Sequence, residues 1–425
     1  MGKAAKVSGT VTVPGDKSIS HRAVMLASMA EGQSRIQGFL PAEDTLRTVG
    51  MMIAMGVDVQ EVSPTEIRIK GRGMRAFEEP QDVIDAGNSG TTMRIGAGVL
   101  SAQPFVTIVS GDPYLRHRPM GRIVRPLTRM GAEITGRKEN TLPPLCIRGG
   151  ALRGIRYEMP VASGQVKSSI LLAGLYADSP VTVVEPLPSR DHTERMLLSM
   201  GARVVREGKE VTVYPAERLH PLSMAIPADI SSASFFLVLA ASVPGAILRV
   251  PGVGVNPHRT GLISVLRRMG ADIQFESPRD EGGEPVADIV VHGRGLGPAQ
   301  VAPEEVPALI DEVPALCVAA AMAEGRTEIR GAAELRVKES DRIGAMVKEL
   351  STLGVSCGEY PDGLWVKGPA RVTGGQRVES YGDHRIAMSL MVLSYASGVP
   401  VKISDTACIA TSFPGFPGML REVTR

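Results

Sequence analysis

Six segments of the chain share one order of apolar and polar positions. In each, a short run with β-branched residues leads into a polar turn, and a stretch of small apolar residues follows. The first run is typical of a strand and the last stretch of a buried helix. The polar side chains of the turns are of the kind that accept hydrogen bonds from the free N–H groups of a helix start. The pattern therefore predicts six strand–turn–helix elements, with turns at 15–22, 87–94, 162–169, 228–233, 310–314 and 382–385.

A second signature follows the first five of these helices. It consists of Met or Leu, then Gly, then a small apolar residue, and Gly can take the left-handed conformation that closes a helix. Successive copies lie roughly 70 to 84 residues apart, whereas solenoid repeats usually run about 20 to 50 residues. Two globular domains therefore fit the repeat better than an elongated scaffold. The five glycines are Gly56, Gly131, Gly201, Gly270 and Gly354.

The ends of the repeat suggest how the domains divide. A sixth unit begins near Asp383, reaches a second helix near 415–423, and then lacks closing strands. A predicted strand at 7–13 has no preceding helix, so we expect it to pair with the last units. This places one α/β domain at 14–226 and a second, formed by 1–13 plus 227–425, with three units in each. Two domains of about 200 residues are of ordinary size.

Composition excludes several classes of function. Hydrophobic residues make up 43% and charged residues 22% of the chain, as in ordinary globular proteins. A net charge of +2 and 4% aromatic residues give little basis for nucleic-acid binding. The longest apolar run, 235–248, is shorter than a membrane span and is interpreted as a buried helix with its exit turn. The first six residues lack the apolar core of a signal peptide, so we expect a cytoplasmic protein.

The familiar signatures of metals and cofactors are missing from the sequence. The four cysteines lie far apart without a C-x-x-C pair, and the seven histidines form no H-E-x-x-H motif. Gly252 and Gly254 lack the third glycine of a dinucleotide-binding fingerprint. We therefore expect no metal and no cofactor, and chemistry that depends on cations and carboxylates.

Cations occur at three of the predicted helix starts. Arg22 lies one turn after Ser18, and with Lys17 it can meet one anion near a helix N-terminus. A capped helix with solvated cations would show the same residues, but repetition of the design weakens that alternative. The other two copies are Asn88, Gly90, Thr91 and Arg94, and Ser163, Gln165 and Lys167.

Carboxylates stand out in the second half of the chain. Asp311 interrupts an apolar segment, so its pKa can be adjusted for proton transfer, although it could instead cap the helix beginning near Pro314. Lys338 and Arg342 are four residues apart and are expected on one helix face with Glu339 beside them, as they would also be on a solvated helix. The charge-rich loops at 116–122 and 190–195 are compatible with a site or with an exposed surface.

Five motifs give the whole chain a resemblance to the 5-enolpyruvylshikimate-3-phosphate synthase family. They are Pro14–Arg22, Gly87–Thr91, Arg118–Gly121, Arg336–Arg342 and Asp383–Arg385. The resemblance implies two domains of three βαβαββ units each, an inside-out α/β barrel, and an active site in the cleft between domains. It also implies a monomer that acts on small molecules in the shikimate pathway to chorismate and aromatic amino acids, with no nucleic acid or membrane partner.

The activity implied by the resemblance is transfer of the enolpyruvyl group of phosphoenolpyruvate to the 5-hydroxyl of shikimate 3-phosphate. By similarity, Asp311 would accept the hydroxyl proton, and Glu339 with Lys17 would manage the proton at the methylene carbon. The residues implied for shikimate 3-phosphate are Lys17, Ser18, Arg22, Ser163, Gln165, Arg190, Asp311 and Lys338. Those implied for phosphoenolpyruvate are Lys17, Gly90, Arg118, Gln165, Arg342 and Arg385.

Some positions depart from the best-known branch of that family. Gly164 stands where that branch has a serine, Thr411 where it has a lysine and His192 where it has a tyrosine. The segments 190–194 and 411–413 resemble a second branch of the family. The nearest rival is the related transferase acting on UDP-N-acetylglucosamine, which typically carries a reactive cysteine where 116–121 has none. A non-catalytic phosphometabolite-binding protein is a further alternative, against which Asp311 argues.

Overall fold

The computed structural model describes residues 6–424, which divide into two compact units. Unit 1 comprises the residues up to Asp16, Pro227–Asp280 and the chain from Pro285 onward. Unit 2 comprises Lys17–Ile226 and Glu281–Glu284. Each unit has its own continuous hydrophobic core.

One sheet pattern is repeated through both units. In five four-stranded sheets the first strand runs parallel to the second, and the fourth strand lies between the second and the third. Among the described residues, the sixth sheet consists of two parallel strands, which correspond to the first two strands of the others. The βαβαββ prediction is thus confirmed. Within residues 6–424 the sheets are open and none closes into a barrel.

Two short strands pair with strands that lie far from them in the sequence. β1 (Ser8–Thr10) pairs in parallel with β14 (Ile247–Gly254), the pairing with later units that the repeat predicts. It is shorter than the predicted 7–13 strand. β13 (Ser223–Ala225) pairs in parallel with β2 (Glu31–Gln37) and so completes the first sheet of unit 2.

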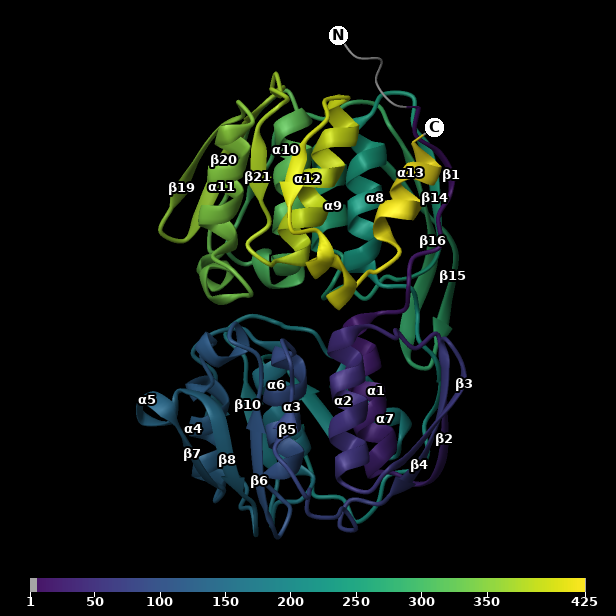
Figure 1. Cartoon of the computed structure of the whole chain (residues 1–425). Helices are drawn as coiled ribbons and strands as arrows, with labels where there is room; N and C mark the ends of the chain where they lie inside the picture. The colour runs from purple at the N-terminus through teal and green to yellow at the C-terminus, as the bar shows by residue number, and fades with distance from the viewer. Residues whose placement is uncertain (1–5, 425) are drawn as a thin grey trace. The chain divides into compact units, whose positions relative to one another are not determined.

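The elements of unit 2 follow its three sheets (Figure 1). The first set is β13 with α1 (Lys17–Met29), β2 (Glu31–Gln37), α2 (Glu43–Ala54), β3 (Asp58–Ser63) and β4 (Glu66–Arg72). The second set is β5 (Ile84–Asp85), α3 (Gly90–Leu100), β6 (Val106–Ser110), the 3-10 turn η1 (Leu115–His117), α4 (Gly121–Met130), β7 (Glu133–Gly136), α5 (Arg137–Asn140) and β8 (Leu142–Arg148). The third set is β9 (Arg156–Glu158), α6 (Gly164–Gly174), β10 (Val181–Val184), α7 (His192–Ser199), β11 (Val204–Glu207) and β12 (Glu210–Val213).

The elements of unit 1 follow the same plan. The first set is β1, α8 (Ile230–Ser242), β14 (Ile247–Gly254), α9 (Gly261–Arg268), β15 (Asp272–Glu281) and β16 (Glu284–His292). The second set is β17 (Gln300–Val301), η2 (Val306–Ala308), η3 (Ile310–Glu312), α10 (Val313–Met322), β18 (Gly325–Ile329), η4 (Ala333–Val337), α11 (Arg342–Thr352), β19 (Ser356–Tyr360) and β20 (Gly363–Gly368). The third set is β21 (Arg377–Glu379), α12 (His384–Ser397), β22 (Lys402–Ser404), η5 (Ala407–Thr411) and α13 (Phe416–Val423).

The first helix of each repeat forms the interior of its unit. In unit 1, α8, α10 and α12 pack against one another, and every residue of α8 is buried (Figure 1). In unit 2, α3 packs against both α1 and α6. Small side chains allow this close helix packing, and the larger apolar residues of the sheets cover it. Helices therefore lie inside and sheets outside, as the resemblance implies.

Helix starts and ends agree with the sequence patterns. All six polar turns precede buried helices, and four side chains cap them: Ser89, Ser163, Asp229 and Asp383. The five signature glycines all have positive φ, between 81° and 120°. An L-residue with a side chain rarely takes that conformation, which explains why glycine ends each second helix.

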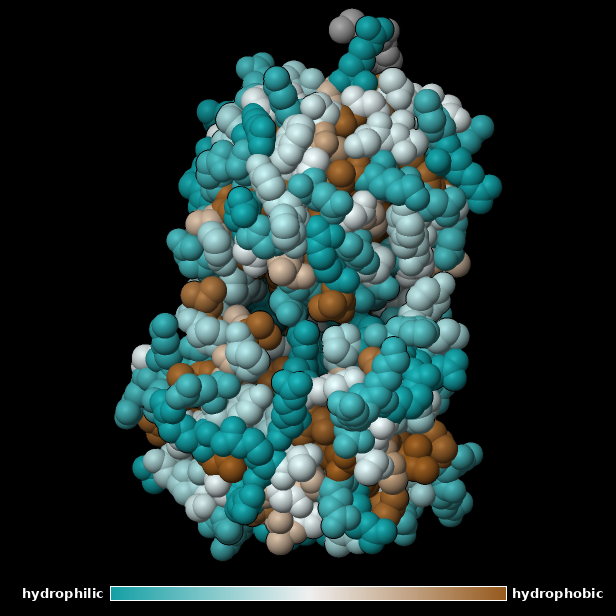
Figure 2. All heavy atoms as spheres, turned by 90° about the vertical axis from the view of Figure 1, so that its left-hand side faces the viewer, coloured by the Kyte–Doolittle hydropathy of each residue, from teal (hydrophilic) through white to brown (hydrophobic). Residues whose placement is uncertain are grey.

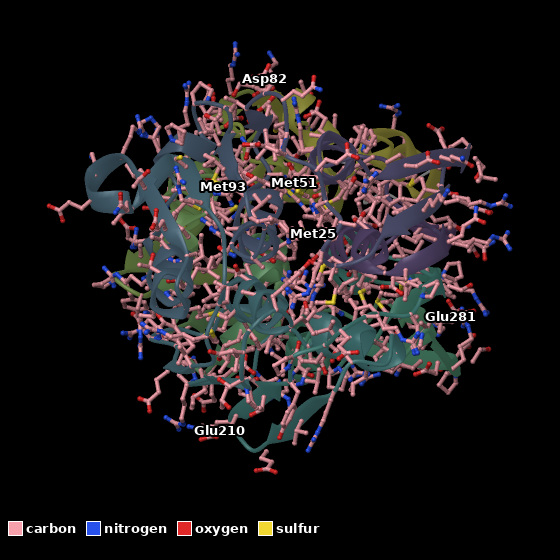
Figure 3. The ribbon with its side chains drawn as sticks, turned by 90° about the horizontal axis from the view of Figure 1, so that it is seen from below. Met25, Met51, Asp82, Met93, Glu210 and Glu281 are labelled. Carbon is pink, nitrogen blue, oxygen red and sulfur yellow. The ribbon has the colours of Figure 1, made fainter. Side chains whose placement is uncertain are left out.

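Methionines fill part of the unit 2 core. Met25, Met51 and Met93 lie among packed side chains, whereas Asp82 and Glu210 lie at the periphery (Figure 3). The face shown in Figure 2 is mostly hydrophilic, with hydrophobic residues in small groups. Among residues 6–424, no helix is long and apolar enough to cross a membrane.

Candidate active site

Arg22 is the centre of a buried polar cluster in unit 2. Its Nε donates to Thr193 Oγ1 at 2.9 Å, and its Nη2 donates to Ser168 Oγ at 2.9 Å. Its Nη1 donates to the Ser18 carbonyl at 3.0 Å, and Arg190 Nη1 donates to Ser18 Oγ at 3.1 Å. The helix starts of α1, α6 and α7 thus bring together three predicted site residues: Ser18, Arg22 and Arg190.

Lys17 stands at the first position of α1 and is held by a carboxylate. Its Nζ lies 2.9 Å from Asp44 Oδ2, and the two side chains are 15% and 12% exposed. The carboxylate fixes the position of the ammonium group, and the remaining exposure of the pair leaves that group within reach of a ligand. Asp44 was not predicted as a site residue, because an acidic residue in the first turn of a helix such as α2 is common.

A second polar chain links α3 and α6. Arg94 Nη1 donates to Gln165 Oε1 at 2.8 Å, and Gln165 Nε2 donates to Thr91 Oγ1 at 2.9 Å. Ser163 caps α6 by accepting from the Val166 backbone N–H at 3.4 Å. The amide of Gln165 is therefore oriented by both of its polar atoms, beside two helix N-termini.

Arg118 lies against Gly90. Its Nη1 donates to the Asn88 carbonyl at 3.0 Å, and only 7% of the residue is exposed. A Cβ atom on Gly90 would lie 3.1 Å from Arg118 Cζ and Nη2, closer than ordinary contact distance. Within the loop 116–122, Arg118 is thus buried at the start of α3, whereas Arg116 and His117 are exposed.

In unit 1 the predicted carboxylate lies at the meeting point of three cations. Asp311 Oδ1 accepts from Lys338 Nζ and from Arg342 Nη1, each at 3.3 Å. Arg385 Nη1 donates to the Asp311 carbonyl at 2.9 Å. The Asp311 side chain is 13% exposed. The helix-cap alternative is wrong, because α10 starts at Val313 and has no side-chain cap.

Arg342 is the most enclosed cation of this group. Its Nε donates to Asp383 Oδ2 at 2.8 Å, its Nη2 pairs with Glu339, and its side chain is 1% exposed. Burial opposes its charge, but the carboxylates of Asp383, Glu339 and Asp311 outweigh burial and raise the pKa of Arg342. Arg342 therefore stays charged, and the carboxylates around it have fixed positions.

One prediction about this group is wrong. Lys338 and Arg342 do not share a helix face, because η4 ends at Val337 and α11 begins only at Arg342. The Asp341 side chain, which accepts from the Gly344 N–H at 3.1 Å, starts a new helix at this point. Lys338 and Arg342 still converge, since both donate to Asp311.

Comparison with known proteins decides the family. Residues 1–420 match the family described as EPSP synthase (3-phosphoshikimate 1-carboxyvinyltransferase). The chain belongs to the EPSP synthase family. The family sequences similar to it include the 3-phosphoshikimate 1-carboxyvinyltransferase of Desulforudis audaxviator (strain MP104C), 53% identical over 98% of this chain and 96% of that protein. The enzyme of the same name from Alkaliphilus metalliredigens (strain QYMF) is 50% identical over 100% of this chain and 99% of that protein.

Solved structures show the same fold. EPSP synthase from Acinetobacter baumannii superposes with a TM-score of 0.88 at 44% identity, over 100% of this chain and 97% of that one. The enolpyruvyl transferase NikO from Streptomyces tendae is 18% identical with a TM-score of 0.78, over 100% of this chain and 96% of that one, and is similar in fold alone. The two-domain mixed α/β fold class is thus confirmed.

The EPSP synthase resemblance and the geometry assign the predicted residues to two groups. Unit 2 holds Lys17, Ser18, Arg22, Gly90, Arg118, Ser163, Gln165 and Arg190. Unit 1 holds Asp311, Lys338, Glu339, Arg342 and Arg385. Their individual roles remain predictions. Within residues 6–424, no group of three His, Cys, Asp or Glu side chains is arranged to hold a metal ion.

Besides Asp44, several polar residues in or beside these groups were not predicted as site residues. Asp383 stood in a quoted motif, but only its contacts reveal that it braces Arg342. Thr193 and Ser168 orient Arg22, and hydroxyls inside buried helices give no distinctive sequence signal. Arg259 is buried between carboxylates, and its sequence neighbours resemble an ordinary loop.

Proposed function

We propose that this chain transfers the enolpyruvyl group of phosphoenolpyruvate to the 5-hydroxyl of shikimate 3-phosphate and releases phosphate. The observation that carries the proposal is the match to the EPSP synthase family over 1–420, with full-length relatives of that activity at 50–53% identity. The cation groups suit two substrates that both carry phosphate and carboxylate. The reaction belongs to the route to chorismate and aromatic amino acids.

The Arg22 cluster is proposed to bind shikimate 3-phosphate. Arg22 and Arg190 donate to oxygens of Ser18, so two guanidinium groups converge on one helix start. A helix N-terminus adds partial positive charge and free N–H groups, which favour a phosphate. Lys17 and two residues at the start of α6, Ser163 and Gln165, are assigned to the same substrate. Lys338 is assigned to the same substrate from unit 1.

Phosphoenolpyruvate is proposed to bind the remaining cations. Arg118 lies beside the small residue Gly90, which lets an anion approach the α3 start closely. Arg342 and Arg385 are assigned to the substrate's anionic groups, because planar guanidinium groups bind carboxylate and phosphate with paired hydrogen bonds. Lys17 and Gln165 are assigned to both substrates.

Asp311 is proposed as the base for the attacking hydroxyl. It takes the proton of the 5-hydroxyl while the oxygen forms a bond to C2 of phosphoenolpyruvate, and Glu339 with Lys17 delivers a proton to C3. The product of this addition is a tetrahedral intermediate. Loss of a C3 proton to the same groups and cleavage of the bond between C2 and the phosphate oxygen then release phosphate. Preorganised cations stabilise the anionic intermediate more than the separate substrates.

Phosphate release tests the activity. We expect release from phosphoenolpyruvate with shikimate 3-phosphate as acceptor and none above background with UDP-N-acetylglucosamine. Release with the sugar nucleotide alone would assign the chain to the related transferase. No phosphate release with either acceptor, while phosphoenolpyruvate or shikimate 3-phosphate still binds by calorimetry, would favour a binding protein.

Replacement of Asp311 tests the assigned base. Asp311→Asn keeps the shape and an oxygen that can accept from Lys338 and Arg342, but it cannot take a proton readily. We expect kcat to fall by about 10² to 10⁴, with a much smaller change in shikimate 3-phosphate affinity. Glu304→Gln, which neutralises an exposed carboxylate of the same segment, is the control. A kcat for Asp311→Asn close to that control would remove Asp311 from the chemistry.

We also propose a monomer in the cytoplasm. Both groups of assigned residues come from one chain, and the four cysteines are free thiols, as is usual in a reducing compartment. Light scattering after gel filtration would measure the mass. A dimer that dissociates with loss of activity would overturn the monomer assignment.

A further inference from the structure

Glu312 follows Asp311 and is fully buried. Its side chain is 0% exposed, and its Oε1 accepts a hydrogen bond from Ser231. Arg385 Nη1 lies 3.8 Å from the same oxygen, beyond hydrogen-bond distance. In the part of the chain that the structure describes, Glu312 Oε2 has no hydrogen-bond partner. A buried carboxylate therefore forms a long ion pair with a cation assigned to a substrate, without a hydrogen bond to it.

Ser231 has a fixed direction of hydrogen bonding. Arg259 Nη2 donates to Ser231 Oγ at 2.8 Å, and a guanidinium group can only donate. The single hydroxyl hydrogen of Ser231 is therefore directed to the other neighbour, Glu312. The chain Arg259–Ser231–Glu312 is oriented from cation to carboxylate and holds the carboxylate in place.

Arg259 is itself held firmly. It is 2% exposed, and it pairs with Asp16 Oδ2 at 3.0 Å and with Asp229 Oδ1 at 3.3 Å. The backbone segments that carry these two carboxylates also bond to each other, from the Asp16 N–H to the Pro227 carbonyl and from the Asp229 N–H to the Pro14 carbonyl, each at 2.9 Å. The Arg259 guanidinium is thus a rigid support for Ser231.

We propose that Ser231, supported by Arg259, is a positioning residue for the Glu312 carboxylate. Its hydrogen bond keeps that carboxylate from hydrogen bonding to Arg385, so that Arg385 stays available to an anionic substrate. This inference rests on the proposed function, which assigns Arg385 to phosphoenolpyruvate. Without the Ser231 hydroxyl, Glu312 loses its hydrogen-bond donor inside the protein. A buried carboxylate in that state turns toward Arg385, whose Nη1 is already within 3.8 Å, and competes with the substrate.

The test compares two serines of the same buried helix. Ser231→Ala removes the donor to Glu312, whereas Ser234→Ala removes a buried hydroxyl that donates to the Ser231 carbonyl. We expect Ser231→Ala to raise the KM for phosphoenolpyruvate by about tenfold. The KM for shikimate 3-phosphate and the unfolding midpoint should change no more than in Ser234→Ala.

A second substitution separates positioning from loss of packing. Glu312→Gln removes the charge that competes for Arg385, so the double variant with Ser231→Ala and Glu312→Gln should recover most of the lost phosphoenolpyruvate affinity. Failure to recover, or an equal rise of KM in Ser234→Ala, would overturn the proposal. Absence of transfer activity in the unmodified protein would instead overturn the proposed function, and the two failures are therefore distinguishable.

Discussion

Arginines of the two units differ in the partners to which their guanidinium groups donate. In unit 2, Arg22 donates to two hydroxyls and a carbonyl, and Arg94 donates to the Gln165 amide oxygen. In unit 1, Arg342 meets the carboxylates of three residues. Neutral oxygens orient a guanidinium group and leave its charge to attract a ligand. Carboxylates orient it and offset that charge.

The difference suggests separate tasks for the two regions. Contacts with hydroxyls orient a cation without adding negative charge, so they favour an anionic ligand nearby. A region that mixes cations with carboxylates can hold an anion and also accept a proton, which an addition to a double bond requires. Disturbing the carboxylate region should therefore affect stability and turnover, while disturbing the hydroxyl region should affect binding.

Arg342→Lys should have the largest effect. Lysine cannot reach Asp311, Glu339 and Asp383 with a planar fork of donors, so buried carboxylates lose partners. We expect roughly 3–5 kcal/mol of destabilisation and the loss of most turnover, measured by urea unfolding and steady-state kinetics. Arg336→Lys, at a partly exposed arginine that also pairs with carboxylates, is the control. Equal effects in both variants would contradict a special role for the buried cluster.

Asp229 gives a pH test of the same region. Burial and the neighbouring Asp16 carboxylate raise the pKa of Asp229 from 3.8 to about 7. The folded chain therefore binds this proton more tightly, and the stability it contributes falls as pH rises from about 4 to about 7. Asp229→Asn keeps a helix cap and lacks the titration. Relative to the unmodified protein, its free energy of unfolding should rise with pH by on the order of 3 kcal/mol across that window.

Urea unfolding at pH 4, 5, 6 and 7 measures this difference. Asp383→Asn, which replaces another buried helix cap of unit 1, is the comparison variant. A constant difference between Asp229→Asn and the unmodified protein at all four values would show that Asp229 does not titrate in this range.

Thr193→Val tests the hydroxyl region. The side chain is buried, and valine has nearly the same shape but cannot accept from Arg22 Nε. We expect a cost of about 1–2 kcal/mol, seen as a five- to thirtyfold rise in the KM for shikimate 3-phosphate with kcat nearly unchanged. Thr182→Val, in strand β10 and bonded to Thr212, is the control. A fall in kcat with KM constant would place Arg22 in the chemistry instead.

Sequence patterns predicted the repeated elements well, because helix caps and closing glycines are local signals. Ser163, Asp229 and Gly131 could each be interpreted from their immediate neighbours. The repeat also indicated that the first strand pairs with later units, since the last unit lacks closing strands. The expected barrel is not a closed one, since the sheets stay separate. Closure depends on pairing between edge strands of different sheets, which no local sequence pattern specifies.

The site was only partly predictable for the same reason. Cations at helix starts were evident from the sequence, but their holders Thr193, Asp44 and Asp383 come from other elements of the same unit. The break between Val337 and Arg342 was missed because four-residue spacing was interpreted as helical before the Asp341 cap was considered. Partners that are distant in sequence leave no spacing to detect.

Gly90→Ala should have the smallest effect and would test whether the two substrates use separate cations. The added Cβ meets the Arg118 guanidinium at 3.1 Å, so the side chain must move by a few tenths of an ångström. A flexible side-chain end can make that shift at little cost in stability. We expect the KM for phosphoenolpyruvate to rise severalfold, roughly 1 kcal/mol, while the KM for shikimate 3-phosphate stays constant. Gly50→Ala, which meets open space, is the control, and equal changes in both KM values would show that Arg118 serves both substrates.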